Sequence, residues 1–289
     1  MAAKSAFNSS MNTRAKIKEV FAHILIYAQL LLMLAIVLIP VIFIISSAFS
    51  NVPHLRQAGL LPDNPSLGAF QRLFADTNFT LWYRNTLFIA IMSTIFTVIF
   101  TSTMGYVFGR LRFKGKKATL VTMMVMQMFP GFMGMMVMHT FFIEIGLFDS
   151  HWALIALYSV GSIPGTTWLI KGYLQGISME LDESAMLDGA NRFQIFTKIV
   201  FPLMKPIVAF VAYGAFMGPW MDFMLPRILL RSNHNMTIGV GLYDLISGNI
   251  TDFTMFAAGA LLVAIPMVIG FYVFQRYIIE GITAGANKG

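Results

Sequence analysis

The chain contains no cysteine and few charged residues. The lack of cysteine excludes a disulfide framework and a thiolate metal site. Only 11% of its 289 residues are charged, whereas soluble domains average about 25%, and 57% are hydrophobic, with a mean hydropathy of +0.72. The sequence also lacks the G-x-x-x-x-G-K-[ST] phosphate loop of nucleotide hydrolases. A water-soluble fold could not cover so much apolar surface, so we predict an integral membrane protein.

Stretches without Asp, Glu, Lys or Arg delimit the predicted spans. A spanning helix needs about 20 mostly apolar residues, and a charge at the bilayer centre costs about 3 kcal/mol. The first stretch is too long for a signal peptide and lacks a small-x-small cleavage pattern. We therefore predict an all-α integral membrane protein with six transmembrane helices, at 23–48, 86–109, 119–142, 152–171, 204–225 and 254–275. Pro130 with two glycines predicts a kink in the third span, and the sequence GSIPG at 161–165 predicts a break in the fourth.

The basic residues predict the orientation of these spans. With the N-terminus inside, fifteen Lys and Arg residues fall in inside segments and five fall in outside segments. This positive-inside asymmetry predicts that both termini are cytoplasmic. The predicted organisation is a cytoplasmic segment 1–22, a six-helix membrane domain 23–275 and a cytoplasmic tail 276–289. Because the orientation explains the net charge of +7, no nucleic-acid partner is inferred.

The cytoplasmic loop between the fourth and fifth spans, 178–203, differs from the other loops. Four of the thirteen acids lie within nine residues, at Glu180, Asp182, Glu183 and Asp188. Ser178 is a plausible N-cap, and acids in a first turn suit the positive end of the helix dipole. Gly189 is placed to end this helix in a left-handed conformation, and a second helix is expected from about Asn191 to Pro202. Such a helix–glycine–helix element is either a solvated connector or a rigid element that docks into a partner protein.

A resemblance between this loop and a known sequence motif favours the docking interpretation. The loop resembles the EAA loop of permease subunits in ATP-binding-cassette (ABC) importers, in which Glu-Ala-Ala is followed after three residues by Gly and, further on, by a hydrophobic-x-x-Pro ending. The corresponding residues here are Glu183, Ser184, Ala185, Gly189, Ile199 and Pro202, and Asp188 lies in the similar DGA sequence. The substitution by Ser184 keeps a small side chain. Further segments, YVFGRLRFKGKK, QMFPGF, WLIKGYLQGIS and GITAGANKG, are similar to G-type permeases of maltose and maltodextrin importers.

This resemblance implies a multi-pass protein of the bacterial inner membrane with the type I ABC importer permease fold. It would pair with a second homologous permease, two ATPase subunits and an extracytoplasmic solute-binding protein. The substrate would be an oligosaccharide, namely maltose or maltodextrin, with galacto-oligosaccharides as the alternative. Transport would proceed by alternating access, and the loop would couple it to the ATPases. The chain would be no enzyme and have no catalytic or metal site, and ATP and Mg would be used by the partner subunits.

Two further sets of residues are candidates for function. Tyr213, Phe216, Met217 and Trp220 share one helical face of the fifth span, where they either stack on sugar rings or pack as membrane aromatics. The glycine-rich tail, with Gly285, Lys288 and Gly289, is either a frayed terminus or an extended strand that contacts the ATPases. Gly214 and Gly218 form a small-xxx-small face that predicts close helix contact.

Two other classes of protein compete with the importer. An ion-coupled secondary transporter would need intramembrane carboxylates and two repeated halves, and neither is evident in the sequence. A non-transporting membrane assembly subunit would explain the spans but not the acidic loop.

Overall fold

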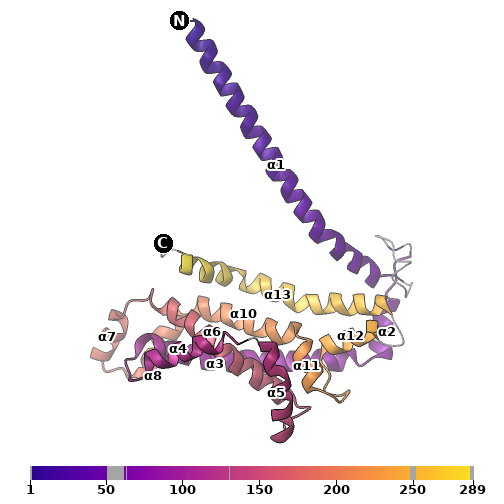
Figure 1. Cartoon of the computed structure of the whole chain (residues 1–289), viewed down its shortest axis with the longest axis vertical. Coiled ribbons are helices and arrows are strands. Elements are labelled where there is room, and N and C mark those ends of the chain that lie inside the picture. Colours follow the sequence, from indigo (N-terminus) through magenta and orange to yellow (C-terminus); the bar gives the residue numbers. More distant parts are fainter. Residues whose placement is uncertain (1, 51–61, 63, 130, 248–251, 287–289) are drawn as a thin grey trace. The chain divides into compact units, whose positions relative to one another are not determined.

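A computed structural model describes residues 2–50, 62, 64–129, 131–247 and 252–286. All regular structure in this part of the chain is helical (Figure 1). The long helices are α1 (Ala2–Ala48), α3 (Phe79–Arg110), α6 (His151–Leu174), α10 (Lys205–Met221) and α13 (Phe253–Ala286). The shorter ones are α2 (Gly68–Asp76), α4 (Lys116–Met126), α5 (Gly131–Glu144), α7 (Glu180–Leu187), α8 (Arg192–Ile195), the π-helical turn η2 (Phe196–Val200), α9 (Phe201–Leu203), α11 (Met224–Leu229) and α12 (Ile238–Ser247).

The chain divides into two compact units. One comprises residues 1–71 and 252–261, and the other comprises residues 72–251 and 262–289. In the first unit, the rings of Phe43 and Phe253 lie 6.0 Å apart, and the Ser66 amide donates to the Phe49 carbonyl. The second unit holds the acidic loop and the cavity discussed below.

Four helical segments among the described residues are long and apolar enough to cross a membrane: Lys18–Ala48, Phe79–Arg110, His151–Leu174 and Phe253–Tyr277. A fifth candidate is the pair Arg192–Leu203 and Lys205–Met221, which is bent by 80°. These segments agree with five of the six predicted spans. The membrane-protein prediction is therefore confirmed, whereas the orientation and the count of six remain predictions.

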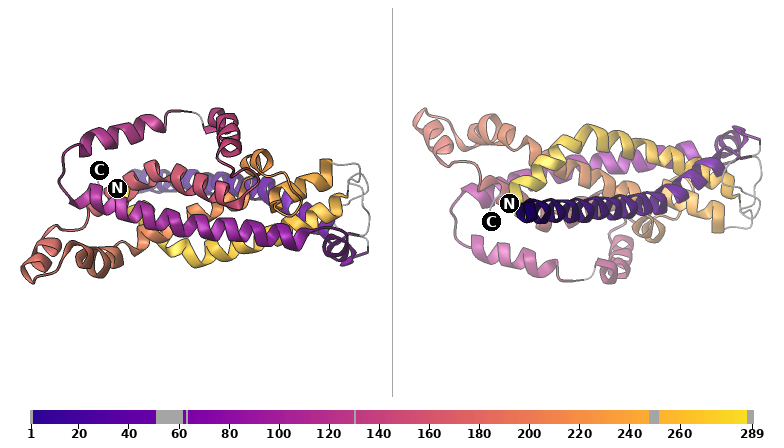
Figure 2. Two further views of the ribbon diagram at one scale, coloured as in Figure 1. Left: turned by 90° about the horizontal axis from the view of Figure 1, so that it is seen from below. Right: turned by 90° about the horizontal axis from the view of Figure 1, so that it is seen from above.

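The third predicted span, 119–142, is not one continuous helix. It consists of α4, with 11 residues, and α5, with 14, and each is shorter than a full span. Figure 2 shows α4 and α5 as two separate helical segments. The amides of Gln127, Met128 and Phe129 donate to carbonyls three residues earlier, which closes tight turns after α4. A residue before a proline avoids the α conformation, and Pro130 follows this turn in the sequence. Its presence accounts for two separate helices where we predicted one kinked helix. Pro130 itself lies outside the described residues.

The predicted break in the fourth span is wrong. α6 runs without interruption from His151 to Leu174 with Pro164 inside it. The hydroxyls of Ser162 and Thr166 donate to carbonyls of the same helix, at Ser159 and Ser162. Side-chain bonds of this kind satisfy backbone groups near a proline within a membrane helix.

Helices α3 and α6 approach each other closely through glycines of α3. A Cβ atom added to Gly105 would lie 2.3 Å from Ile170 Cγ2, and one added to Gly109 would lie 2.9 Å from Leu174 Cδ1. Such small-residue contacts let membrane helices pack backbone against side chain. The predicted close contact at Gly214 and Gly218 is not made within the described part of this chain, where no neighbour lies within 4 Å of a Cβ atom added at either position.

Replacing Gly105 with alanine is expected to loosen the α3–α6 contact. The new methyl group would overlap Ile170, and overpacking of this kind typically costs about 1–3 kcal/mol. We expect the thermal midpoint of the purified protein to fall by several degrees, measured by fluorescence-detected size exclusion after heating. Gly214→Ala is the matched control, since its methyl group meets no neighbour. Equal midpoints for both variants would contradict this packing.

The end of this unit opposite α7 and α8 carries α11, α12 and the loop 231–236 (Figure 1). The Asp149 carboxylate accepts hydrogen bonds from the Arg231 and Ser232 amides, at 2.8 and 3.2 Å, and from the Ser232 hydroxyl. The Asn85 amide group donates to the carbonyls of His234 and Met236, at 2.8 and 3.0 Å. The loop is therefore held by side chains of α3 and of the turn before α6.

The stabilisation of this loop by Asp149 depends on pH, because the ionised carboxylate is the form that accepts these hydrogen bonds. Burial opposes ionisation of the carboxyl, but hydrogen bonds from Ser232, the Arg231 amide and Asn235 outweigh it and lower the Asp149 pKa. A lowered pKa means that the stabilisation is complete above the unfolded-state value of about 4 and is lost as pH falls through the folded-state pKa. Asp149→Asn should lower the thermal midpoint at pH 7, and the difference from the parent chain should shrink below about pH 4. A difference that stays constant with pH would contradict this role.

Candidate functional site

Helix α7 and the turn after it form the first half of the acidic loop. Glu180, Asp182 and Glu183 lie in the first turn of α7, and the Ser178 hydroxyl accepts from the Glu180 amide at 3.2 Å, so the predicted helix start is confirmed to within a residue. Gly189 has a φ of 84°, which confirms the left-handed end. The Ala190 amide donates to the Ala185 carbonyl and the Gly189 amide to the Met186 carbonyl. This pair of bonds is the Schellman arrangement, which only a residue tolerant of positive φ completes without strain.

The second half of the loop begins at Asn191, as predicted. Its side chain accepts from the Gln194 amide at 2.9 Å, while the Gln194 side chain accepts from the Asn191 amide at 2.8 Å. These two bonds form a capping box, which fixes the start of α8. The two caps on either side of Ala190 therefore hold α7 and α8 in a fixed mutual arrangement.

The inner face of the loop is bound to the membrane helices. Ala185 joins a buried cluster to which α8, η2, α3, α6 and α10 all contribute. Its members are Tyr106, Ile170, Leu174, Ala185, Ile195, Val200, Met204, Ile207 and Val211. This cluster therefore joins the loop to the ends of three long helices.

A buried ion pair adds a polar contact on the same face. Arg110 Nε, at the last residue of α3, lies 3.6 Å from Asp182 Oδ2, and these side chains are 3% and 1% exposed. The guanidinium also donates to the carbonyls of Ile177 and Ser178, at 3.0 and 3.4 Å. Burial raises the Asp182 pKa, and the nearby Arg110 and Arg192 oppose that rise. Sequence reasoning counted Arg110 only as a charge that sets orientation. The available signal was the spacing of Asp182 and Ala185, which places both on one face of a helix.

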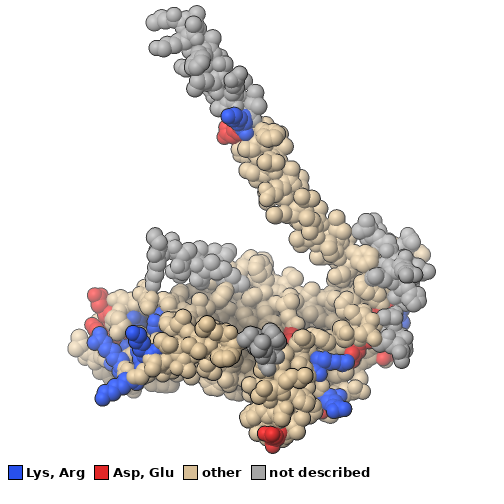
Figure 3. Space-filling model, in the orientation of Figure 1, with Lys and Arg blue, Asp and Glu red and all other residues tan. Residues whose placement is uncertain are grey.

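The outer face of the loop is exposed and carries both acids and apolar groups. Glu183, Ser184 and Asp188 are exposed. Leu187 is 90% exposed and Phe193 is 74% exposed. On the face shown in Figure 3, acidic side chains lie at the tip of this end and basic side chains lie next to them. Large apolar side chains exposed beside charges are typical of a protein–protein interface.

The chain direction changes sharply after the loop, but not at the predicted residue. Pro202 lies inside α9, and the 80° bend falls between Leu203 and Lys205. Ile199 lies in η2, where the Phe201 amide donates to the Phe196 carbonyl five residues earlier. The bend follows from Pro206, which lacks an amide hydrogen and therefore suits the first turn of the new helix α10.

The predicted aromatic face of α10 contains one buried residue and three partly exposed residues. Trp220 is 1% exposed, its ring stacks on Phe216 at 5.5 Å, and its indole N–H donates to the Val263 carbonyl at 3.2 Å. In this conformation Trp220 is thus a packing residue. Tyr213, Phe216 and Met217 are partly exposed. Asp222, at the end of α10, accepts from the Tyr158 hydroxyl at 2.8 Å.

In the described residues, the tail does not form the extended strand that was one of its two interpretations. α13 continues as a helix to Ala286, so Gly285 lies in its last turn. Propagating an existing helix is far easier than starting one, which explains why two glycines do not end it. Lys288 and Gly289 lie outside the described residues.

The fold defines a multi-pass helical membrane protein, with an exposed loop that is fixed against the ends of its long helices. Residues 101–283 match the family of binding-protein-dependent transport system inner membrane components. The chain belongs to this family, which confirms the resemblance read from the EAA loop. The matched segment contains α4–α12, the loop and most of α13.

Individual relatives extend the similarity along nearly the whole chain. The maltodextrin transport system permease protein MdxG of Bacillus subtilis is 38% identical over 268 residues, which covers 91% of this chain and 95% of that protein. The galactooligosaccharides transport system permease protein GanQ of the same organism is 35% identical and covers 97% and 99%. A chain from the crystal structure of a bacterial ABC transporter involved in alginate import has the same fold, with a TM-score of 0.78, 24% identity, and coverage of 88% and 95%.

Proposed function

We propose that this chain is a membrane permease subunit of an ATP-driven oligosaccharide importer, with malto-oligosaccharides as substrate. It works by alternating access together with a second homologous permease. Two ATPase subunits bind ATP and Mg and receive the acidic loop, and an extracytoplasmic binding protein delivers the sugar. The chain itself carries no catalytic residue.

The observation that carries this proposal is the two-sided construction of the loop. Its inner face is anchored by Ala185, Asp182 and the surrounding cluster, while its outer face exposes Glu183, Leu187 and Phe193. A loop that is anchored on its inner face and can bind a partner on its outer face would move as a rigid body when that partner moves. We call this loop the lever. Asp188, Gly189, Ile199 and Pro202 complete the lever, with Gly189 as its turn and Pro202 near its bend.

The sugar path is assigned to the face of α10 that bears Tyr213, Phe216 and Met217. Aromatic rings on a partly exposed helical face offer apolar surfaces on which sugar rings can stack. Trp220, which packs behind Phe216, holds this face in place by the 5.5 Å ring stack. The maltodextrin assignment is supported by the relative MdxG, at 38% identity.

The proposal is tested by uptake into proteoliposomes that contain the complete complex. Labelled maltose, maltotriose, longer maltodextrins and galacto-oligosaccharides are offered with the binding protein outside and ATP inside. We expect uptake of malto-oligosaccharides that requires ATP. Uptake that follows an ion gradient and ignores ATP would contradict the proposal.

A galacto-oligosaccharide substrate is the second candidate. It is supported by the 35% identity with GanQ over nearly the full length of both chains. The same uptake panel separates the two candidates, because each predicts a different preferred sugar from an identical preparation. Competition by unlabelled sugars gives an independent ranking.

A further inference from the structure

A cavity of ≈ 710 Å³ lies between the start of α4, the end of α3 and the last turns of α6. It is separate from the outer face of the acidic loop. Lys116, Lys117 and Lys171 line it, and its lining contains no acidic residue. Among the residues that the structure describes, neither ion pair between side chains involves any of these lysines.

The three lysine ammonium groups lie around one cavity, and no carboxylate lines it to balance their charge. The Lys116 ammonium donates to the Leu111 carbonyl at 2.9 Å, and the Lys171 ammonium lies 4.8 Å from the centroid of the Trp168 ring. Burial, together with the neighbouring Lys171 and Arg112, lowers the Lys116 pKa. Like charges held together in a partly dehydrated space favour binding of an anion.

A group of backbone hydrogen-bond donors beside the lysines also lacks side-chain acceptors. α4 begins after Gly115 with no side-chain cap and no acid in its first turn, so its first N–H groups have no side-chain acceptor. Uncapped helix starts of this kind are satisfied by an oxyanion.

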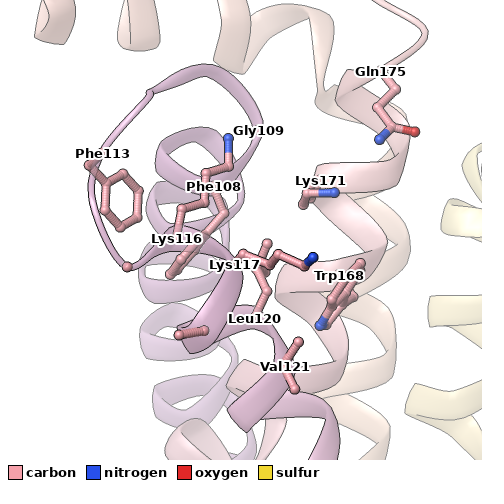
Figure 4. Close-up of a pocket in the computed structure, with 12 residues that line it drawn as sticks. Phe108, Gly109, Phe113, Lys116, Lys117, Leu120, Val121, Trp168, Lys171 and Gln175 are labelled. Atoms are coloured by element: carbon pink, nitrogen blue, oxygen red, sulfur yellow. The ribbon is translucent and has the colours of Figure 1, made fainter.

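The cavity also has an apolar end. Figure 4 shows Gln175 and Lys171 at one end and Leu120 and Val121 at the other, with Trp168 between them. Trp168 lies six residues before the end of α6, which is about 9 Å along the helix axis. Lys171 toward one end, with a tryptophan and aliphatic groups toward the other, matches the order of headgroup, interface and acyl chain in a membrane leaflet.

We propose that this cavity binds an anionic phospholipid of the cytoplasmic leaflet. The phosphate group lies among the lysine ammonium groups and the first N–H groups of α4, and the acyl chains follow Leu120, Val121 and Trp168. Basic pockets between membrane helices on the cytoplasmic side are suited to such headgroups. The bound lipid thereby supports α4, which has few other contacts with the rest of this unit. The inference rests on the membrane family and not on the identity of the sugar.

The test uses the full chain purified with whatever subunits accompany it, stripped of lipid and titrated with phosphatidylglycerol or phosphatidylcholine under native mass spectrometry. The variant Lys117→Gln/Lys171→Gln removes two charges from the cavity and keeps the Lys116 bond to Leu111. The matched control, Lys114→Gln/Lys205→Gln, removes two charges from exposed residues that do not line the cavity. Each basic residue near an anionic surface contributes about 1 kcal/mol, so we expect binding of phosphatidylglycerol to weaken roughly 30-fold in the cavity variant. The control and the phosphatidylcholine titration should change little.

Four results would overturn the proposal. Equal weakening in both double variants would indicate general surface attraction. Equal affinity for the two lipids in the parent chain would exclude headgroup recognition. A photo-crosslinker at Val121 that captures protein rather than lipid would show that a partner subunit fills the cavity. Displacement of phosphatidylglycerol by millimolar glycerol phosphate would likewise reject a site for an intact lipid.

Discussion

Replacing Glu183 with lysine is expected to abolish ATP-driven uptake while leaving insertion and folding intact. Glu183 is exposed on the outer face of α7, so no partner inside this unit is lost. A charge reversal at a docking surface removes a favourable contact and adds a repulsive one, at a cost of about 3 kcal/mol. That cost corresponds to a loss of at least about 100-fold in binding of the ATPase subunit.

The measurement is copurification of the ATPase with the tagged chain, followed by uptake in proteoliposomes. Glu180→Lys is the control, because it makes the same charge change in the same exposed helical turn but lies outside the EAA motif. It should impose a similar helix-dipole cost and retain uptake. Normal uptake by Glu183→Lys would reject the docking role of α7.

Replacing Arg110 with methionine is expected to detach the loop from α3. The substitution leaves the Asp182 carboxylate buried without its nearest cation, and breaking a buried ion pair from one side typically costs about 3–5 kcal/mol. It also removes the donors to the Ile177 and Ser178 carbonyls. We expect a large drop in the thermal midpoint and loss of uptake, even though the outer face of α7 is unchanged.

The double variant Arg110→Met/Asp182→Leu distinguishes an ion pair from simple packing. With both charges gone, stability should recover, because paired replacement by apolar groups is often neutral or favourable. The single variant should also become less unstable as pH falls from 7.5 to 5.5, since without Arg110 the raised Asp182 pKa rises further and the protonated form is tolerated. Arg112→Met, at an exposed residue nearby, is the control. A single variant as stable as its parent would contradict the anchoring role.

Much of the loop could be predicted because its signals are local. Gly189 ends α7 through a left-handed conformation, and Asn191 starts α8 through a bond to a residue three positions later. Caps and turns depend on neighbours in the chain, so residue type and spacing are enough to predict them. The bend was placed at Pro202 rather than beside Pro206 because both prolines carry the same local signal, and packing chooses between them.

The sequence by itself determined the membrane environment, the approximate position of five spans and the helix–glycine–helix form of the acidic loop, because charge-free length and local capping leave few alternatives. Only the tertiary structure decided which polar residues face inward. Arg110 and Asp182 lie 72 positions apart in the chain, and Gly105 meets Ile170 across two helices. The tertiary structure also decided the place of Trp220. Its aromatic ring could stack on a sugar, but it is buried against Phe216. Such pairings depend on how helices approach in space, and the helical period of one segment does not specify its partner.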